Sequence, residues 1–132
     1  MSPRIRTILY WLTTALAGLM LAGSGMGNLT RAPQVVEALV ALGYPTYFPV
    51  ILGSWKVLAA AALLAPGLPR LKEWAYAGVF FAMSGAVASH VLAGDPPAKA
   101  LAPVVIVSIV LASWWLRPES RKLTAPMAVP AA

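Results

Sequence analysis

The stretch from Phe48 to Ala65, FPVILGSWKVLAAAALLA, decides the fold class of this chain. It is an apolar run of membrane-spanning length that carries a single charged residue, Lys56. A lysine at bilayer depth costs roughly 2.5–3.5 kcal/mol on insertion scales, so such a residue normally pairs with another group or lines a cavity. The run therefore predicts a membrane helix, and Lys56 raises a question of function.

The composition of the whole chain predicts a membrane protein. Hydrophobic residues make up 60% of the 132 residues, charged residues make up 11%, and the mean hydropathy is +0.77. These values lie well outside the range of soluble globular proteins. A membrane helix needs about 20 apolar residues, and the sequence offers such stretches at about 7–27, 46–65, 74–92 and 101–116. We predict an all-α fold, a four-helix transmembrane bundle within residues 1–117, followed by a disordered cytoplasmic tail over 118–132.

Two segments near the N-terminus need separate interpretation. Arg4 and Arg6 followed by an apolar run also describe a signal peptide, but small residues at helix-packing spacing favour a retained first helix. These small residues are Thr14, Gly18, Ala22 and Gly25. Residues 28–47 are too short and too polar to span, and they predict a short amphipathic helix between the first two spans that ends at Gly43.

Lysine and arginine counts predict the orientation. One side of the predicted bundle carries Arg4, Arg6, Arg70, Lys72, Arg117, Arg121 and Lys122, and the other carries only Arg31 and Lys99. By the positive-inside rule both termini are cytoplasmic. The third span is also rich in small residues, Ala75, Gly78, Ala82, Gly85, Ala86 and Ser89, which we interpret as a surface for tight packing within the bundle.

Polar residues in the outer half of the bundle predict a pocket. Lys56 lies roughly 15 Å below the outer end of its helix, and its side chain is expected to point outward. The candidate site consists of Lys56, His90, Glu37, Asn28, Ser89 and Trp55. In the functional interpretation this pocket binds a small molecule with a polar head. The alternative is a structural ion pair of Lys56 with Glu37, and Asp95 in its Gly-Asp-Pro-Pro turn is assigned to turn formation.

Several kinds of chemistry are excluded or disfavoured. The net charge of +6 comes from basic residues beside apolar segments, which indicates lipid headgroups rather than nucleic acid. The chain has no cysteine and one histidine, so we expect no iron–sulfur cluster, no bis-histidine haem and no zinc site. We assign no metal ligand, and the catalytic residues, if a reaction occurs, are not identified by the sequence.

A family resemblance rests on Leu42-Gly-Tyr-Pro45, Leu52-Gly-Ser-Trp-Lys56, the run APGLPRLKEWAYAG at 65–78, Ser89-His90 and Gly94-Asp95. Over about Leu9 to Arg117 the chain resembles the DoxX-like family of small bacterial membrane proteins. The resemblance implies a four-helix, multi-pass protein of the bacterial inner membrane. It also implies a place beside membrane oxidoreductases, because the family is named after a small subunit of a quinone-reducing, thiosulfate-oxidising enzyme. It carries over no catalytic residue.

Two hypotheses follow. In the first, the chain is a small subunit of a membrane oxidoreductase, or a component that binds a quinone or another lipophilic small molecule through Lys56 and His90. In the second, it is a non-catalytic interaction or assembly factor for another membrane protein. The expected partners are the lipid bilayer and either a larger oxidoreductase subunit or further copies of the chain. A transporter is the least favoured alternative, since four helices leave little room for alternating access.

Overall fold

A computed structural model describes residues 1–124, which contain five α-helices and one 3-10 turn. The helices are α1 (Pro3–Leu29), α2 (Pro33–Ala41), α3 (Phe48–Leu64), α4 (Pro69–Leu92) and α5 (Pro97–Leu116), followed by the 3-10 helix η1 (Glu119–Arg121). No strand occurs in this part of the chain. The prediction of an all-helical protein is confirmed.

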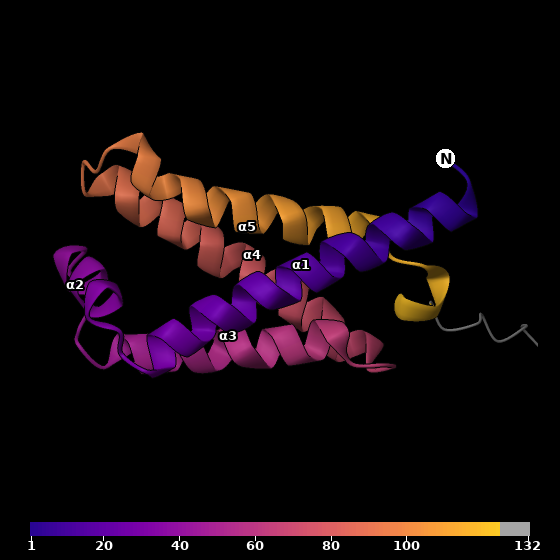
Figure 1. The fold of residues 1–132 in the computed structure, drawn as a ribbon, viewed down its shortest axis with the longest axis horizontal. Helices are drawn as coiled ribbons and strands as arrows, with labels where there is room; N and C mark the ends of the chain where they lie inside the picture. Colours follow the sequence, from indigo (N-terminus) through magenta and orange to yellow (C-terminus); the bar gives the residue numbers. More distant parts are fainter. Residues whose placement is uncertain (125–132) are drawn as a thin grey trace, which may run out of the picture.

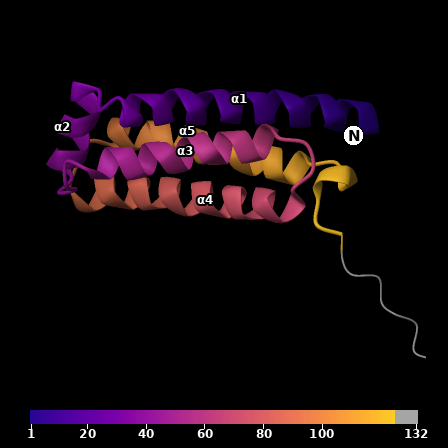
Figure 2. The same cartoon turned by 90° about the horizontal axis from the view of Figure 1, so that it is seen from below.

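The four longer helices pack side by side, and α2 lies at one end of them (Figures 1 and 2). α1 packs against α3 and α5, and α4 packs against α5 and α3. The bundle thus has two distinct ends. The α2 end holds α2 and the α4–α5 connection, and the N-terminal end holds the start of α1 and the α3–α4 connection (Figure 1).

Three helices are long and apolar enough to cross a membrane, namely α1, α4 and α5. α3 is also apolar but has 17 residues, so it rises only about 25 Å at 1.5 Å per residue. The helices differ from the predicted spans chiefly at their starts, because a proline opens α1, α4 and α5 at the first helical turn. Proline fits this position because its missing N–H would have no partner there.

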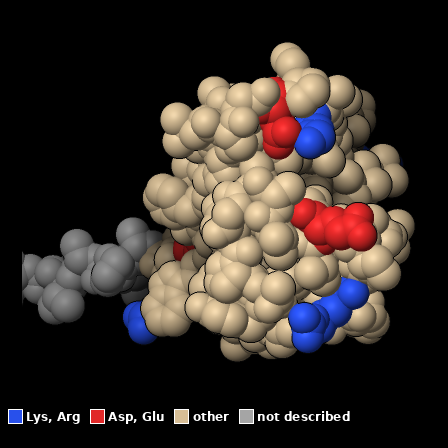
Figure 3. Space-filling view, turned by 90° about the vertical axis from the view of Figure 1, so that its left-hand side faces the viewer, with Lys and Arg blue, Asp and Glu red and all other residues tan. Residues whose placement is uncertain are grey.

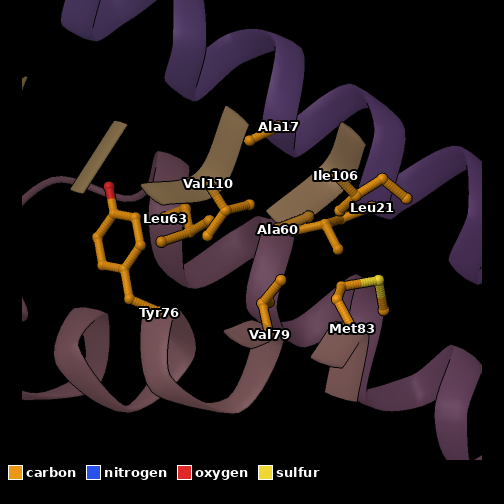
Figure 4. Close-up of a cluster of buried hydrophobic side chains, with 9 residues drawn as sticks. All are labelled: Ala17, Leu21, Ala60, Leu63, Tyr76, Val79, Met83, Ile106 and Val110. Atoms are coloured by element: carbon orange, nitrogen blue, oxygen red, sulfur yellow. The ribbon is translucent and has the colours of Figure 1, made fainter. Parts of the chain in front are cut away.

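The core is formed where the four packed helices meet. Figure 4 shows side chains from α1, α3, α4 and α5 pointing toward one another. The cluster comprises Ala17, Leu21, Ala60, Leu63, Tyr76, Val79, Met83, Ile106 and Val110. Because α1 supplies Ala17 and Leu21, this segment is an integral part of the bundle core.

A buried chain of hydroxyl groups crosses this core. The Ser113 Oγ of α5 lies 2.6 Å from the Thr14 Oγ1 of α1 and 2.8 Å from the Tyr76 hydroxyl of α4. All three groups are buried, so each satisfies the hydrogen-bonding need of the others in a medium without water. These hydrogen bonds join three helices, α1, α4 and α5.

Glycines bring α1 and α3 together, whereas Gly78 and Gly85 of α4 face open space. A Cβ atom on Gly53 would lie 2.7 Å from the carbonyl oxygen of Gly25, and one on Gly25 would lie 2.9 Å from a Val57 methyl group. A Cβ atom on Gly78 or Gly85 would meet nothing within 4 Å. The expected packing role therefore holds for Gly25 of α1, and it is wrong for the two glycines of α4.

Basic side chains tie the helix ends together at the N-terminal end. Lys72 lies inside α4 and is fully buried, and its ammonium donates to the carbonyl oxygen of Ala62 at 2.6 Å and to that of Ala65. Arg117 pairs with Glu73 at 2.6 Å, and Arg121 donates to the Tyr10 hydroxyl at 3.2 Å. The basic residues predicted to share one side thus meet at one end of the molecule.

The segment predicted to be a disordered tail begins with a short 3-10 helix. Residues 119–121 form η1, from which Arg121 lies over the rings of Tyr10 and Trp11. Residues 125–132, the remainder of the segment predicted to be disordered, lie outside the described residues.

Candidate functional site

A cavity of about 490 Å³ lies at the α2 end, among all five helices. Its apolar walls come from α2, α3, α4 and α5, and polar side chains from α1, α3 and α4 reach into it. The polar lining residues include Ser24, Asn28, Tyr44, Lys56, Ser89 and His90. The short helix α2 covers the cavity because Gly43, with a φ of +89°, ends that helix and lets the chain turn back toward α3.

Lys56 provides the cation of this cavity. The residue is half-buried, and its ammonium donates to the Ser24 hydroxyl at 2.7 Å and, at the long distance of 3.5 Å, to the Asn28 side-chain oxygen. Both partners are neutral. Within residues 1–124 no carboxylate lies within ion-pair distance of Lys56. An ammonium has three donors, so Lys56 keeps donor capacity toward the cavity.

Glu37 does not take part in this arrangement. It is exposed on α2 and does not line the cavity, and no ion pair joins it to Lys56. The alternative interpretation, an ion pair of Lys56 with Glu37 that pins the amphipathic helix, is wrong for the described structure. The physical reason is that Lys56 turns toward α1, where Ser24 and Asn28 provide oxygen atoms.

His90 is held by a carboxylate that sequence reasoning assigned only to a turn. The His90 Nδ1 lies 2.8 Å from one oxygen of Asp95, and Lys99 lies 2.8 Å from the other. The hydrogen bond from Lys99, which has the larger effect, and the one from His90 hold the pKa of Asp95 below its ordinary value of 3.8. The carboxylate is thus ionised at neutral pH, so Nδ1 is the donor and the ring orientation is fixed.

The second ring nitrogen of His90 is left available. This atom, Nε2, makes no hydrogen bond in the described structure. It is accessible, because no buried side-chain nitrogen or oxygen in the described residues lacks a partner. His90 is half-buried and lines the cavity. Its Nε2 can therefore meet a ligand or a water molecule at this end of the bundle.

A hydroxyl pair joins the loop before α3 to α4. The Tyr44 hydroxyl lies 2.8 Å from the Ser89 Oγ, and the Tyr44 ring stacks on Phe48 with centroids 4.6 Å apart. Ser89 also donates to the carbonyl oxygen of Gly85. Tyr44 was missed by sequence reasoning because the Tyr44-Pro45 pair indicated only a turn, and no periodicity predicts its contact with Ser89.

The structure brings five of the six predicted site residues to one cavity. Lys56, Asn28, His90, Ser89 and Trp55 line it, and Glu37 does not. Trp55 is 61% exposed and forms part of the rim. No three His, Cys, Asp or Glu side chains are grouped as a metal site within residues 1–124.

The molecular surface at the α2 end is mostly uncharged. Figure 3 looks onto this end and shows a few charged groups of both signs among neutral atoms. The charged residues there belong to α2 and the segments next to it and to the α4–α5 connection, and they include Arg31, Glu37, Asp95 and Lys99. The excess of basic residues lies at the N-terminal end instead.

Taken together, the cavity offers hydrogen-bond donors and acceptors within an apolar surround. The Lys56 ammonium can donate to a carbonyl or another oxygen, and His90 offers a nitrogen that a carboxylate orients. Such a cavity, apolar with a few polar groups, is the usual form of a small-molecule site.

Comparison with known proteins agrees with the helical arrangement. The family model described as the DoxX-like family matches residues 12–113, which include all of α2, α3 and α4. No curated protein and no solved structure matches the chain. The apolar helices and this match identify a membrane protein with transmembrane helices, and the chain belongs to the DoxX-like family.

Proposed function

We propose that this chain binds a lipophilic molecule with a polar head, such as a quinone, in the cavity at the α2 end. In this proposal it acts as a small subunit of a membrane oxidoreductase or as a ligand-binding component associated with one. Lys56 donates a hydrogen bond to an oxygen of the head, and His90, oriented by Asp95, contacts a second position of the head.

One observation carries this proposal. Lys56 is a half-buried cation that lines a cavity and has only neutral partners, a hydroxyl and an amide oxygen. A purely structural lysine at this depth would be expected to have a carboxylate or several carbonyl groups as partners. Lys72 illustrates that case, since carbonyl oxygens surround its ammonium and it lines neither cavity.

The proposal includes a topology. α1, α3, α4 and α5 all cross the bacterial inner membrane, and both termini lie in the cytoplasm, as the gathering of basic residues at the N-terminal end favours. The cavity then opens in the outer half of the bilayer. α3 crosses despite its short length, because the aromatic Tyr47 next to its start suits the interface and a bilayer thins locally around a short span.

A ligand-binding measurement tests the proposal. Purified protein in lipid nanodiscs is titrated with a water-soluble quinone that lacks a long tail, for wild type and for Lys56→Met. A hydrogen bond to a charged donor contributes about 1.5–3 kcal/mol, so the variant should bind about 10- to 100-fold more weakly. Lys122→Met is the matched control, because Lys122 lies at the opposite end and pairs with Glu119.

The controls decide how a loss of binding is interpreted. The thermal midpoint of each variant must stay near that of wild type, so that a lost fold is not mistaken for a lost ligand contact. Binding by Lys56→Met that equals wild-type binding would refute the proposal, and so would a wild-type protein that binds no quinone at all.

A second candidate function, an interaction or assembly factor for another membrane protein, is favoured by the surface of α4. Gly85 is exposed there with open space above it, and small residues allow close approach of a partner helix. The partner would be a larger subunit or a further copy of the chain. Gly85→Leu should then abolish co-purification of that partner from native membranes, whereas Lys56→Met should leave it unchanged.

A further inference from the structure

A second cavity, of about 530 Å³, runs between α3 and α4. Apart from Lys56, its lining consists of apolar side chains and one glycine. On the α3 side it is lined by residues from Leu52 to Ala65, and on the α4 side by residues from Leu71 to Met83. We call this cavity the α3–α4 groove.

The groove exists because the facing residues are small. Ala59 and Ala62 line it from α3, and Ala75 and Gly78 line it from α4. Space above Gly78 is open, since a Cβ atom there would meet nothing within 4 Å. The two helices stay together through larger inward-facing side chains such as Leu63, Val79 and Met83 (Figure 4).

The groove is continuous with the cavity at the α2 end. Leu52, Trp55, Lys56, Ala82 and Met83 line both. Lys56 and Trp55 therefore stand at the junction between a polar compartment and an apolar one. The polar compartment leads toward His90 and Ser89, and the apolar one leads toward the N-terminal end.

The dimensions of the groove favour a single hydrocarbon chain over a helix. From Leu52 to Ala65 the groove follows α3 for about 20 Å, at 1.5 Å per residue. Spread over that length, its 530 Å³ corresponds to a mean cross-section of about 27 Å². An α-helix about 10 Å across fills ~80 Å². A partner helix would therefore not fit between α3 and α4 without separating them.

We propose that the ligand is a single-chain amphiphile, whose polar head binds beside Lys56 and whose tail lies in the α3–α4 groove. This inference rests on the proposed function, because it takes the head site as given. A head held at Lys56 keeps its tail at high effective concentration at the mouth of the groove. The tail then gains van der Waals contact with the groove walls in place of disordered lipid chains.

The test compares two ligands that share a head. A quinone without a tail and the same quinone with a decyl tail are titrated into protein in nanodiscs, with ligand concentration expressed per lipid to remove the effect of partitioning. Wild type should bind the decyl ligand at least about fivefold more tightly, because the tail adds dispersion contacts along the groove.

A blocked groove gives the decisive variant. Gly78→Leu places a side chain in the open space of the groove, and it should abolish the gain from the tail while leaving binding of the tail-less quinone within about twofold. Ala77→Leu is the control, because Ala77 is exposed on the same helix but lines neither cavity. It should change the affinity of neither ligand.

The outcomes separate this inference from the proposed function. Equal binding of the two ligands by wild type, with a loss in Lys56→Met, would keep the head site and overturn the groove as the place of the tail. A tail effect that persists in Gly78→Leu would overturn it as well. Failure of both ligands to bind wild type would refute the proposed function and this inference together.

Discussion

At the scale of single residues, two lysines in apolar surroundings have different structural roles. Lys56 keeps neutral partners and faces a cavity, whereas Lys72 is fully buried and donates to carbonyl oxygens at the end of α3. The last carbonyl groups of a helix have no partner within it, and the helix dipole makes them negative. Lys72 therefore caps α3 from the neighbouring helix, α4.

We expect Lys72→Met to destabilise the bundle at its N-terminal end. The substitution removes charge-assisted hydrogen bonds to Ala62 and Ala65 and leaves buried carbonyl groups unpaired, which should lower the free energy of unfolding by about 2 kcal/mol or more. Arg70→Met is the control, because Arg70 is exposed, and it should change that free energy by less than about 0.5 kcal/mol. Denaturant unfolding in detergent micelles measures both, and equal effects would contradict a capping role for Lys72.

At the scale of elements, α1 and α3 approach each other closely. Gly25 and Gly53 face each other there, and a Cβ atom on Gly53 would also lie 2.9 Å from the Leu29 backbone nitrogen. The neighbouring atoms belong to the backbone, so they cannot move aside as a flexible side chain can. This contact sets the position of Ser24 and Asn28 relative to Lys56, because those partners lie on the same turns of α1.

Gly53→Ala should therefore push α1 and α3 apart. Overpacking of this kind costs about 1–3 kcal/mol, and the same displacement should weaken ligand binding at Lys56. Gly78→Ala, on the open face of α4, should be neutral or slightly stabilising, because alanine favours a helix by up to about 1 kcal/mol over glycine. Thermal midpoints of the two variants in detergent test this contrast, and a stable Gly53→Ala protein would refute the close contact.

At the scale of the whole molecule, the charges divide between the two ends. Arg6 donates to the Trp115 carbonyl oxygen at 3.2 Å and Arg121 to that of Leu63 at 3.3 Å, so basic residues from distant parts of the chain meet at the N-terminal end. The α2 end carries fewer basic residues and is mostly neutral (Figure 3). This division is the basis of the proposed orientation in the membrane.

The topology can be measured by cysteine labelling, since the native chain has no cysteine. In intact cells a membrane-impermeant thiol reagent should label Lys99→Cys, whereas Gly67→Cys and Lys122→Cys should react only after permeabilisation. Gly67 lies between α3 and α4 and so reports on whether α3 crosses. Labelling of Gly67→Cys in intact cells would contradict a spanning α3.

Residues of the candidate site could be predicted where their own polarity marks them, but not where their role depends on a contact with another residue. The polar residues within apolar helices stand out in the sequence, so Lys56, His90 and Asn28 could be named from it. The hydrogen bonds of His90 with Asp95 and of Tyr44 with Ser89 depend on turns that bring the partners together. The charge of Glu37 suggested a partner for Lys56, but helix α2 leaves that carboxylate exposed.

The sequence by itself determined the fold class, because membrane helices are marked by long apolar runs and ended by proline and glycine clusters, and both are local features. It also determined which end of the molecule is basic, since charges follow directly from the order of the helices. Only the tertiary structure decided which small residues pack and which leave space. Glycines at similar spacing close the α1–α3 contact in one case and open the α3–α4 groove in the other, because the outcome depends on which helix lies opposite.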